Sequence, residues 1–146
     1  MAFRFVDKTI DDFKVGDRYS FSKTVTEADV VVFAAISGDM SPLHVNAEYA
    51  KTTPYGERIA HGLLTASLVS AALGRMVSPG FLLESCQFQF VAPVRLGDTV
   101  VATAEVLEKD PQQSKLKLRV VCTNQRDEVV LEGSAIQAAV KAKQAG

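Results

Sequence analysis

The stretch that decides the fold is HGLLTASLVSAALGRMV, residues 61–77. Its apolar side chains fall on nearly every side of a helix, which predicts burial on several sides. No Asp, Glu, Lys or Arg occurs from Ile59 to Gly74, yet this run is shorter than the roughly 20 apolar residues that a membrane span requires. We therefore expect a long core helix that ends at Ser78-Pro79-Gly80, and no membrane partner.

Strand-like segments follow this helix with no further helix between them. Leu116, Leu118, Val120 and Cys122 alternate with basic side chains at 115, 117 and 119, which is typical of a strand with one face toward a core. Short connections favour an antiparallel meander. With one earlier strand, these segments predict an α+β fold in which an antiparallel sheet covers the long helix. The expected strands are Tyr19–Val25, Phe81–Val91, Thr99–Leu107, Lys115–Thr123 and Glu128–Val140.

The region before the long helix is helical in part. Thr26 is a suitable N-cap, and the acidic residues that follow it favour the first turn of a helix that should stop near Gly38. A loop is then expected from Asp39 to Asn46, followed by one short helical turn at Ala47–Lys51.

Composition indicates a single globular domain over residues 1–146, with 47% hydrophobic and 23% charged residues. The net charge of −1 lacks the basic footprint of a nucleic-acid binder, so we reject nucleic acid as the main partner. Cys86 and Cys122 form no CxxC pair, and buried reduced thiols are expected instead of a zinc site. Residues 1–17 lack the apolar core of a signal peptide, so a reducing, cytoplasmic location is expected.

The loop at 39–46 carries a carboxylate at Asp39 and an imidazole at His44, with Pro42 between them to stiffen the turn. Adding water to a double bond conjugated with a carbonyl needs a base for the water, an acid for the α-carbon and donors for the enolate oxygen. Asp39 and His44 can share the first two tasks, because imidazole both accepts and delivers protons. The pair is therefore a candidate acid–base site.

The third task suits the start of the long helix at Gly62. Unpaired N–H groups at a helix N-terminus form an anion site, and a glycine allows close approach of substrate. We expect His61 to cap or orient the helix start and leave it out of the catalytic set. Ser67 and Ser70 are expected to bond back to the preceding turn, and no Gly-x-Ser-x-Gly elbow surrounds them, which argues against a serine hydrolase.

Two segments together resemble the signature of the MaoC-like, (R)-specific enoyl-CoA hydratases. They are SGDMSPLHVN, residues 37–46, and IAHGLLTASLVS, residues 59–70. The resemblance extends to Phe88–Asp98 and covers most of the chain. Two positions depart from the usual pattern, since Ser41 replaces an asparagine and Asn46 replaces an aspartate that often follows the histidine.

The resemblance implies a hot-dog fold, in which an antiparallel sheet wraps a long central helix, and a homodimer or higher homo-oligomer with sites near the subunit interface. It implies reversible hydration of a trans-2-enoyl-CoA to the (R)-3-hydroxyacyl-CoA, with an acyl-CoA thioester as substrate and no metal or other cofactor. Asp39 and His44 match the catalytic pair, Gly62 matches the residue whose N–H polarises the thioester carbonyl, and Ser70 matches a serine near the active site.

Two alternatives remain open on this fold. An acyl-CoA thioesterase would direct water onto the carbonyl carbon instead of the β-carbon, although His44 fits that reaction less well. A non-catalytic acyl-binding subunit would keep the cavity beside the helix and make no use of the acid–base pair, and the presence of both Asp39 and His44 argues against it.

Overall fold

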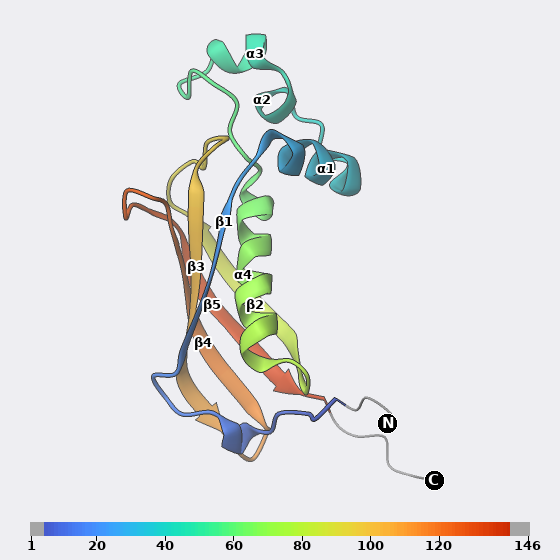
Figure 1. The fold of residues 1–146 in the computed structure, drawn as a ribbon, viewed down its shortest axis with the longest axis vertical. Helices are drawn as coiled ribbons and strands as arrows, with labels where there is room; N and C mark the ends of the chain where they lie inside the picture. Colours follow the sequence, from blue (N-terminus) through green and yellow to red (C-terminus); the bar gives the residue numbers. More distant parts are fainter. Residues whose placement is uncertain (1–4, 141–146) are drawn as a thin grey trace.

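A computed structural model describes residues 5–140, so the ends of the expected domain, 1–4 and 141–146, lie outside the described residues. One long helix packs against a five-stranded antiparallel sheet, which is an α+β architecture (Figure 1). The elements are the 3₁₀ turn η1 (Ile10–Asp12), β1 (Arg18–Thr24), α1 (Glu27–Ser37), α2 (Pro42–Val45), α3 (Ala47–Lys51), α4 (Gly62–Val77), β2 (Phe81–Phe90), β3 (Thr99–Asp110), β4 (Lys115–Thr123) and β5 (Val129–Ala139).

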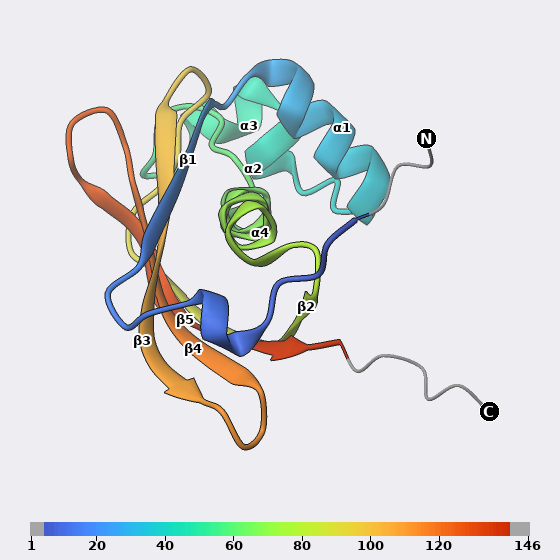
Figure 2. The ribbon, with the colours of Figure 1, turned by 60° about the horizontal axis from the view of Figure 1, so that its bottom comes forward.

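Helix α4 is the core helix that its sequence predicts. The sheet curves around it (Figure 2), and Leu68, Val69 and Leu73 are 5%, 1% and 1% exposed. Each such side chain contributes about 1.5–3 kcal/mol on burial, so this one helix supplies much of the apolar stabilisation. In the described part of the chain, no helix has both the length and the apolar character needed to cross a bilayer.

The alternation expected in β4 is confirmed. Leu116, Leu118, Val120 and Cys122 are all 0% exposed and point into the core, whereas Lys117 and Arg119 face outward. Because successive side chains of a strand point to opposite faces, this strand fixes which side of the sheet covers α4.

The expected meander is confirmed only for β3, β4 and β5. The strand order is β1-β3-β4-β5-β2, so β2 pairs with β5 and not with β3, its successor in sequence. The connection at 91–98 is therefore not a hairpin turn. Its end is bound to the residue after β1, where Val25 N donates to Asp98 O and Gly97 N donates to Val25 O. Strands β2 and β1 therefore form the two sheet edges.

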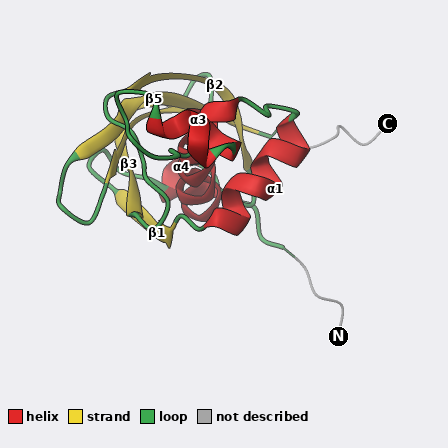
Figure 3. Ribbon diagram, turned by 90° about the horizontal axis from the view of Figure 1, so that it is seen from above, coloured by secondary structure: helices red, strands yellow, loops and turns green. Residues whose placement is uncertain are grey.

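Helix α1 begins and ends as expected. Thr26 accepts from Asp29 N as N-cap, and the C-cap Gly38 has a φ of 77°, which glycine adopts without strain. The loop expected over 39–46 was wrong in part, because Pro42–Val45 forms the one-turn helix α2. Proline at the first helical position favours such a turn, since its missing N–H would be unpaired there anyway. Viewed from above, α1 and α3 lie over the N-terminal end of α4 (Figure 3).

The expectation for the cysteines was right for one of them. Cys122 is buried in β4, and burial raises the pKa of its thiol to about 12, which makes it inert. Cys86 is exposed, because it lies on the edge strand β2, most of whose side chains are uncovered. Both are free thiols.

Asp98 anchors the end of the connection between β2 and β3. It is 5% exposed and accepts hydrogen bonds from Arg95 N at 2.9 Å and Gln125 Nε2 at 2.7 Å. Burial alone would raise the pKa of Asp98, but these bonds and the nearby charge of Arg126 outweigh it and lower the pKa. The carboxylate thus fixes the segment that includes Val94.

Asp98→Asn should lower the free energy of unfolding by about 1–3 kcal/mol at neutral pH, because an amide cannot accept both bonds as a carboxylate does. A carboxyl whose pKa is lowered by folding stabilises the fold above its unfolded pKa, about 3.9, and loses this contribution as the pH falls. The difference between wild type and variant in urea unfolding should therefore shrink between neutral pH and pH 3. A difference independent of pH would contradict a role for the charge.

Candidate active site

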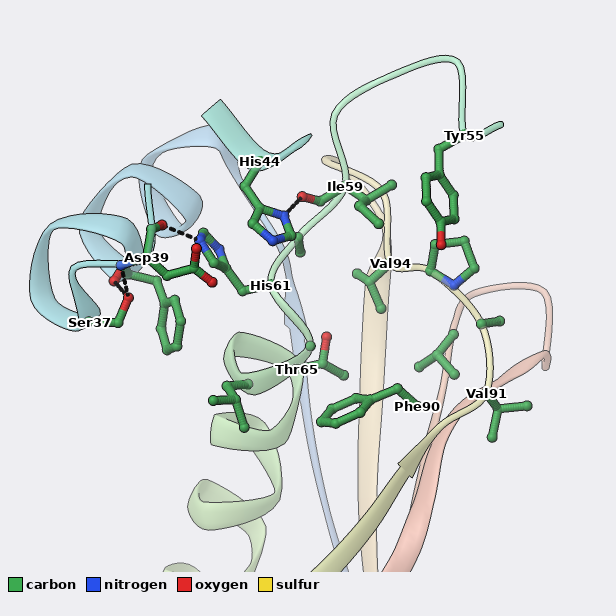
Figure 4. Close-up of a pocket in the computed structure, with 17 residues that line it drawn as sticks. Ser37, Asp39, His44, Tyr55, Ile59, His61, Thr65, Phe90, Val91 and Val94 are labelled. Carbon is green, nitrogen blue, oxygen red and sulfur yellow. Dashed lines mark hydrogen bonds between the residues drawn. The ribbon is translucent and has the colours of Figure 1, made fainter. Parts of the chain in front are cut away.

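A cavity of about 590 Å³ opens at the N-terminal end of α4 (Figure 4). One wall comes from α1 and the loop after it, and the opposite wall comes from the end of β2 and the connection that Asp98 anchors. The lining residues are Phe33, Ser37, Asp39, His44, Tyr55, Ile59, Ala60, His61, Gly62, Leu63, Thr65, Phe90, Val91, Ala92, Pro93, Val94 and Val130. The cavity is thus mainly apolar, with a few polar groups, as in most small-molecule sites.

Asp39 follows the C-cap of α1 and is held by its neighbours. Its N–H donates to Ser37 Oγ at 3.1 Å, and its Oδ1 accepts from Ser41 N at 3.1 Å. Ser37 Oγ itself donates to Phe33 O, which ties the turn to α1. The side chain is exposed to the cavity, so its second carboxylate oxygen remains open to a ligand or water.

His44 lies in the short helix α2, and its ring is fixed at one nitrogen. Nδ1 lies 2.8 Å from Ile59 O, and since a carbonyl oxygen only accepts, Nδ1 carries the proton. In the neutral ring Nε2 is therefore the free, basic nitrogen. Arg58 supports this placement, because its Nε donates to His44 O at 2.9 Å and its side chain also pairs with Glu27 of α1.

His61 is the site residue that sequence reasoning left out. It occupies the N-cap position of α4, but its side chain makes no capping bond. Instead Nε2 donates to Asp39 O at 2.9 Å, and the ring stacks on His44 with centroids 3.9 Å apart at 30°. The residue is 2% exposed, and its Nδ1 has no hydrogen-bond partner within residues 5–140. The expected cap is thus confirmed for the backbone, since His61 O accepts from Leu64 N and Thr65 N, but the side chain contacts Asp39 and His44 instead of the helix.

Asp39, His44 and His61 each place one potential ligand atom within 4.8 Å of the others. The set has the chemistry to hold a divalent cation. One nitrogen of each ring is already bound to a backbone oxygen, since His44 Nδ1 lies 2.8 Å from Ile59 O and His61 Nε2 lies 2.9 Å from Asp39 O. His44 Nε2 and His61 Nδ1 are therefore the ring nitrogens that remain for a ligand. A water molecule between Asp39 and His44 would use the same His44 Nε2.

The N-terminus of α4 supplies free donors to the same cavity. Its first backbone bonds come from Leu64 N and Thr65 N, both to His61 O, so within residues 5–140 the N–H groups of Gly62 and Leu63 have no backbone acceptor. A Cβ at Gly62 would lie 2.9 Å from the ring of Phe90, so glycine permits the close packing here. Gly62 lines the cavity, and its role as the oxyanion donor stays a prediction.

The remaining candidate residues lie apart from the catalytic pair. Ser70 is exposed on α4, two turns beyond Gly62, and does not line the cavity, so its role stays a prediction. Of the two departures from the family pattern, Ser41 donates its backbone N–H to Asp39, and Asn46 caps α3 by accepting from Tyr49 N. Neither side chain replaces a catalytic group.

The long helix wrapped by an antiparallel sheet defines this chain as a hot-dog fold protein. Residues 12–141 match the family described as MaoC like domain, and the chain belongs to that family.

Several relatives match nearly the whole chain. It is 44% identical to the (R)-specific enoyl-CoA hydratase of Rhodospirillum rubrum, over 86% of this chain and 87% of that protein. It is 43% identical to the 3-hydroxybutyryl-CoA dehydratase of Methylorubrum extorquens, over 92% and 86% of the two chains. The unliganded R-hydratase PhaJ1 of Pseudomonas aeruginosa superposes with a TM-score of 0.84 at 34% identity, over 94% and 93% of the chains.

Proposed function

We propose that this protein is an (R)-specific enoyl-CoA hydratase, a hydro-lyase that reversibly adds water to trans-2-enoyl-CoA. The observation that carries the proposal is the position of Asp39 and the free nitrogen of His44 at one cavity, beside the open N–H of Gly62. The names of the relatives from Rhodospirillum rubrum and Methylorubrum extorquens support the same reaction and its reverse.

In the proposed reaction, one water donates its hydrogen bonds to the Asp39 carboxylate and to His44 Nε2. Its oxygen attacks the β-carbon as one of these groups takes its proton, and the electrons of the double bond move toward the thioester oxygen. The Gly62 N–H stabilises the resulting enolate. The α-carbon then receives a proton from the acid–base pair, and the carbonyl re-forms, so the water's atoms end on the two carbons.

Crotonyl-CoA tests this reaction against both alternatives in one assay. We expect the enoyl absorbance to fall without release of free thiol. Thiol release with the enoyl absorbance retained would instead identify a thioesterase, and neither signal would identify a binding protein. The stereochemistry is determined from the product. A dehydrogenase specific for (R)-3-hydroxyacyl-CoA should oxidise this product, and a dehydrogenase specific for the (S)-isomer should not.

We also propose that the chain acts as a cytoplasmic homodimer. Strand β2 is a free sheet edge whose backbone groups can pair with another chain, and it exposes Leu82 at 65% and Leu83 at 45%. Leu63 on α4, 64% exposed, adds apolar surface beside the cavity. Sedimentation equilibrium should give twice the chain mass of 15.8 kDa, and a monomer would contradict the dimer.

The cytoplasmic location is supported by the cysteines. Cys86 and Cys122 are both free thiols, which suit a reducing compartment.

His61→Phe should lower kcat on crotonyl-CoA by about tenfold with little change in KM. Phenylalanine keeps a ring against His44 but loses the bond to Asp39 O, and one such bond is worth about 0.5–1.5 kcal/mol. Ser67→Ala is the matched control on α4, since the Ser67 hydroxyl bonds only to Leu64 O within residues 5–140. Steady-state kinetics measure both. A kcat of wild-type size in His61→Phe would show that this bond does not position Asp39.

A further inference from the structure

The side chain of Thr65 is nearly buried at the cavity, and its hydroxyl has no hydrogen-bond partner among residues 5–140. Thr65 is 3% exposed, lies in the first turn of α4 and lines the cavity. Figure 4 shows its hydroxyl directed into the cavity, toward the side where His44 and Ile59 lie. Within residues 5–140 this oxygen makes no hydrogen bond, although its backbone N–H bonds to His61 O.

Two other helical hydroxyls in this chain behave differently. Ser67 Oγ donates to Leu64 O at 2.6 Å, and Ser37 Oγ donates to Phe33 O at 2.7 Å, which is the ordinary use of serine and threonine within helices. Thr65 could make the same back-bond and does not. Thr65 is nearly buried and lines the cavity, so a ligand or water in the cavity is the partner that its hydroxyl can reach.

The position of Thr65 indicates what that ligand is. Gly62 and Thr65 are three residues apart, so they occupy neighbouring positions on one face of α4. Among the described residues the Gly62 N–H has no backbone acceptor, and helical N–H groups point toward the N-terminal end, where the cavity lies. Two such donors on one face of the helix fit an oxygen that carries negative charge. The attacking water does not need Thr65, since Asp39 and His44 accept both of its hydrogen bonds.

We infer that the Thr65 hydroxyl is a second oxyanion donor, which binds the thioester oxygen together with the Gly62 N–H. This inference rests on the proposed hydratase function. As water adds to the β-carbon, the pair of electrons leaving the double bond gives an enolate, whose oxygen accepts both hydrogen bonds. When the α-carbon is protonated, the carbonyl re-forms and the bonds weaken again. Thr65 keeps its own proton throughout.

Thr65→Val removes the hydroxyl with almost no change of shape, and Thr65→Ser keeps it. We expect kcat on crotonyl-CoA to fall on the order of 10²-fold in the valine variant, the usual loss of one oxyanion donor, and to remain within a few-fold of wild type in the serine variant. Melting temperatures should stay close to wild type, because valine fills the same space. Equal kcat in wild type and Thr65→Val would overturn the inference.

Acetoacetyl-CoA separates an oxyanion donor from a group that only shapes the cavity. Its bound enolate absorbs in the near ultraviolet, so the pH at which half of the ligand is enolate measures oxyanion stabilisation without turnover. In Thr65→Val this midpoint should move upward by about one pH unit for each tenfold loss of stabilisation. An unchanged midpoint would overturn the assignment even if kcat fell. Failure of the proposed function would appear separately, as a wild-type protein that does not hydrate crotonyl-CoA.

Discussion

Asp39→Asn is expected to lower kcat on crotonyl-CoA by about 10²–10⁴-fold, the range typical of a general acid–base group. The amide is nearly the same shape as the carboxylate, and its oxygen can still accept from Ser41 N, as Asp39 Oδ1 does at 3.1 Å. The turn should therefore persist while the proton acceptor for water is lost. Initial rates of absorbance loss measure the effect.

The control for this variant is Ser37→Ala, which removes the side-chain contact to Asp39 N but leaves the carboxylate in place. It should lose far less activity than Asp39→Asn. If both variants fell equally, the loop's conformation and not the carboxylate would be the essential feature. If a folded Asp39→Asn protein turned over at the wild-type rate, Asp39 would have no part in the chemistry.

The sequence predicted the core of this fold well, because local patterns and burial agree there. The helix expected at His61–Val77 is observed as Gly62–Val77, and β4 has the bounds expected from its alternation. The pairing of strands was harder to predict. The sequence of β2 has no pattern that shows whether β3 or β5 is its neighbour in the sheet, and its neighbour is β5. That choice depends on how the sheet wraps α4, which is a property of the whole chain.

The site was predicted in part for a similar reason. Asp39, His44 and Gly62 stand out through residue type, spacing and the family resemblance, and all three line one cavity. His61 and Thr65 did not stand out, because their places at the cavity depend on how distant segments pack. The bond from His61 to Asp39 O spans 22 residues, and the free hydroxyl of Thr65 is apparent only once its neighbours are placed. No pattern of neighbouring residues in the sequence predicts either feature.

His44→Asn tests the second half of the acid–base pair and should also lower kcat by about 10²–10⁴-fold. The asparagine amide can take the place of Nδ1 and donate to Ile59 O, a bond of 2.8 Å in the wild type, so the anchor is kept. The basic Nε2 is removed. His44→Gln is the matched variant, because it places an amide near Nε2 and loses the anchor. Both variants should show a loss of this size by the same measurement, whereas near-normal kcat only in His44→Gln would show that Nε2 serves as a donor and not as a base.

The double variant Asp39→Asn/His44→Asn shows whether the two groups act on one water. If a single water donates to both, removing either group already destroys its activation, and the second change should cost at most about tenfold more. Two losses that multiply fully would indicate independent steps, with one group activating water and the other protonating the α-carbon. The atoms of the pair lie within 4.8 Å of each other, which is close enough for a bridging water. We therefore expect strong non-additivity, measured as kcat of the double variant against the product of the single losses.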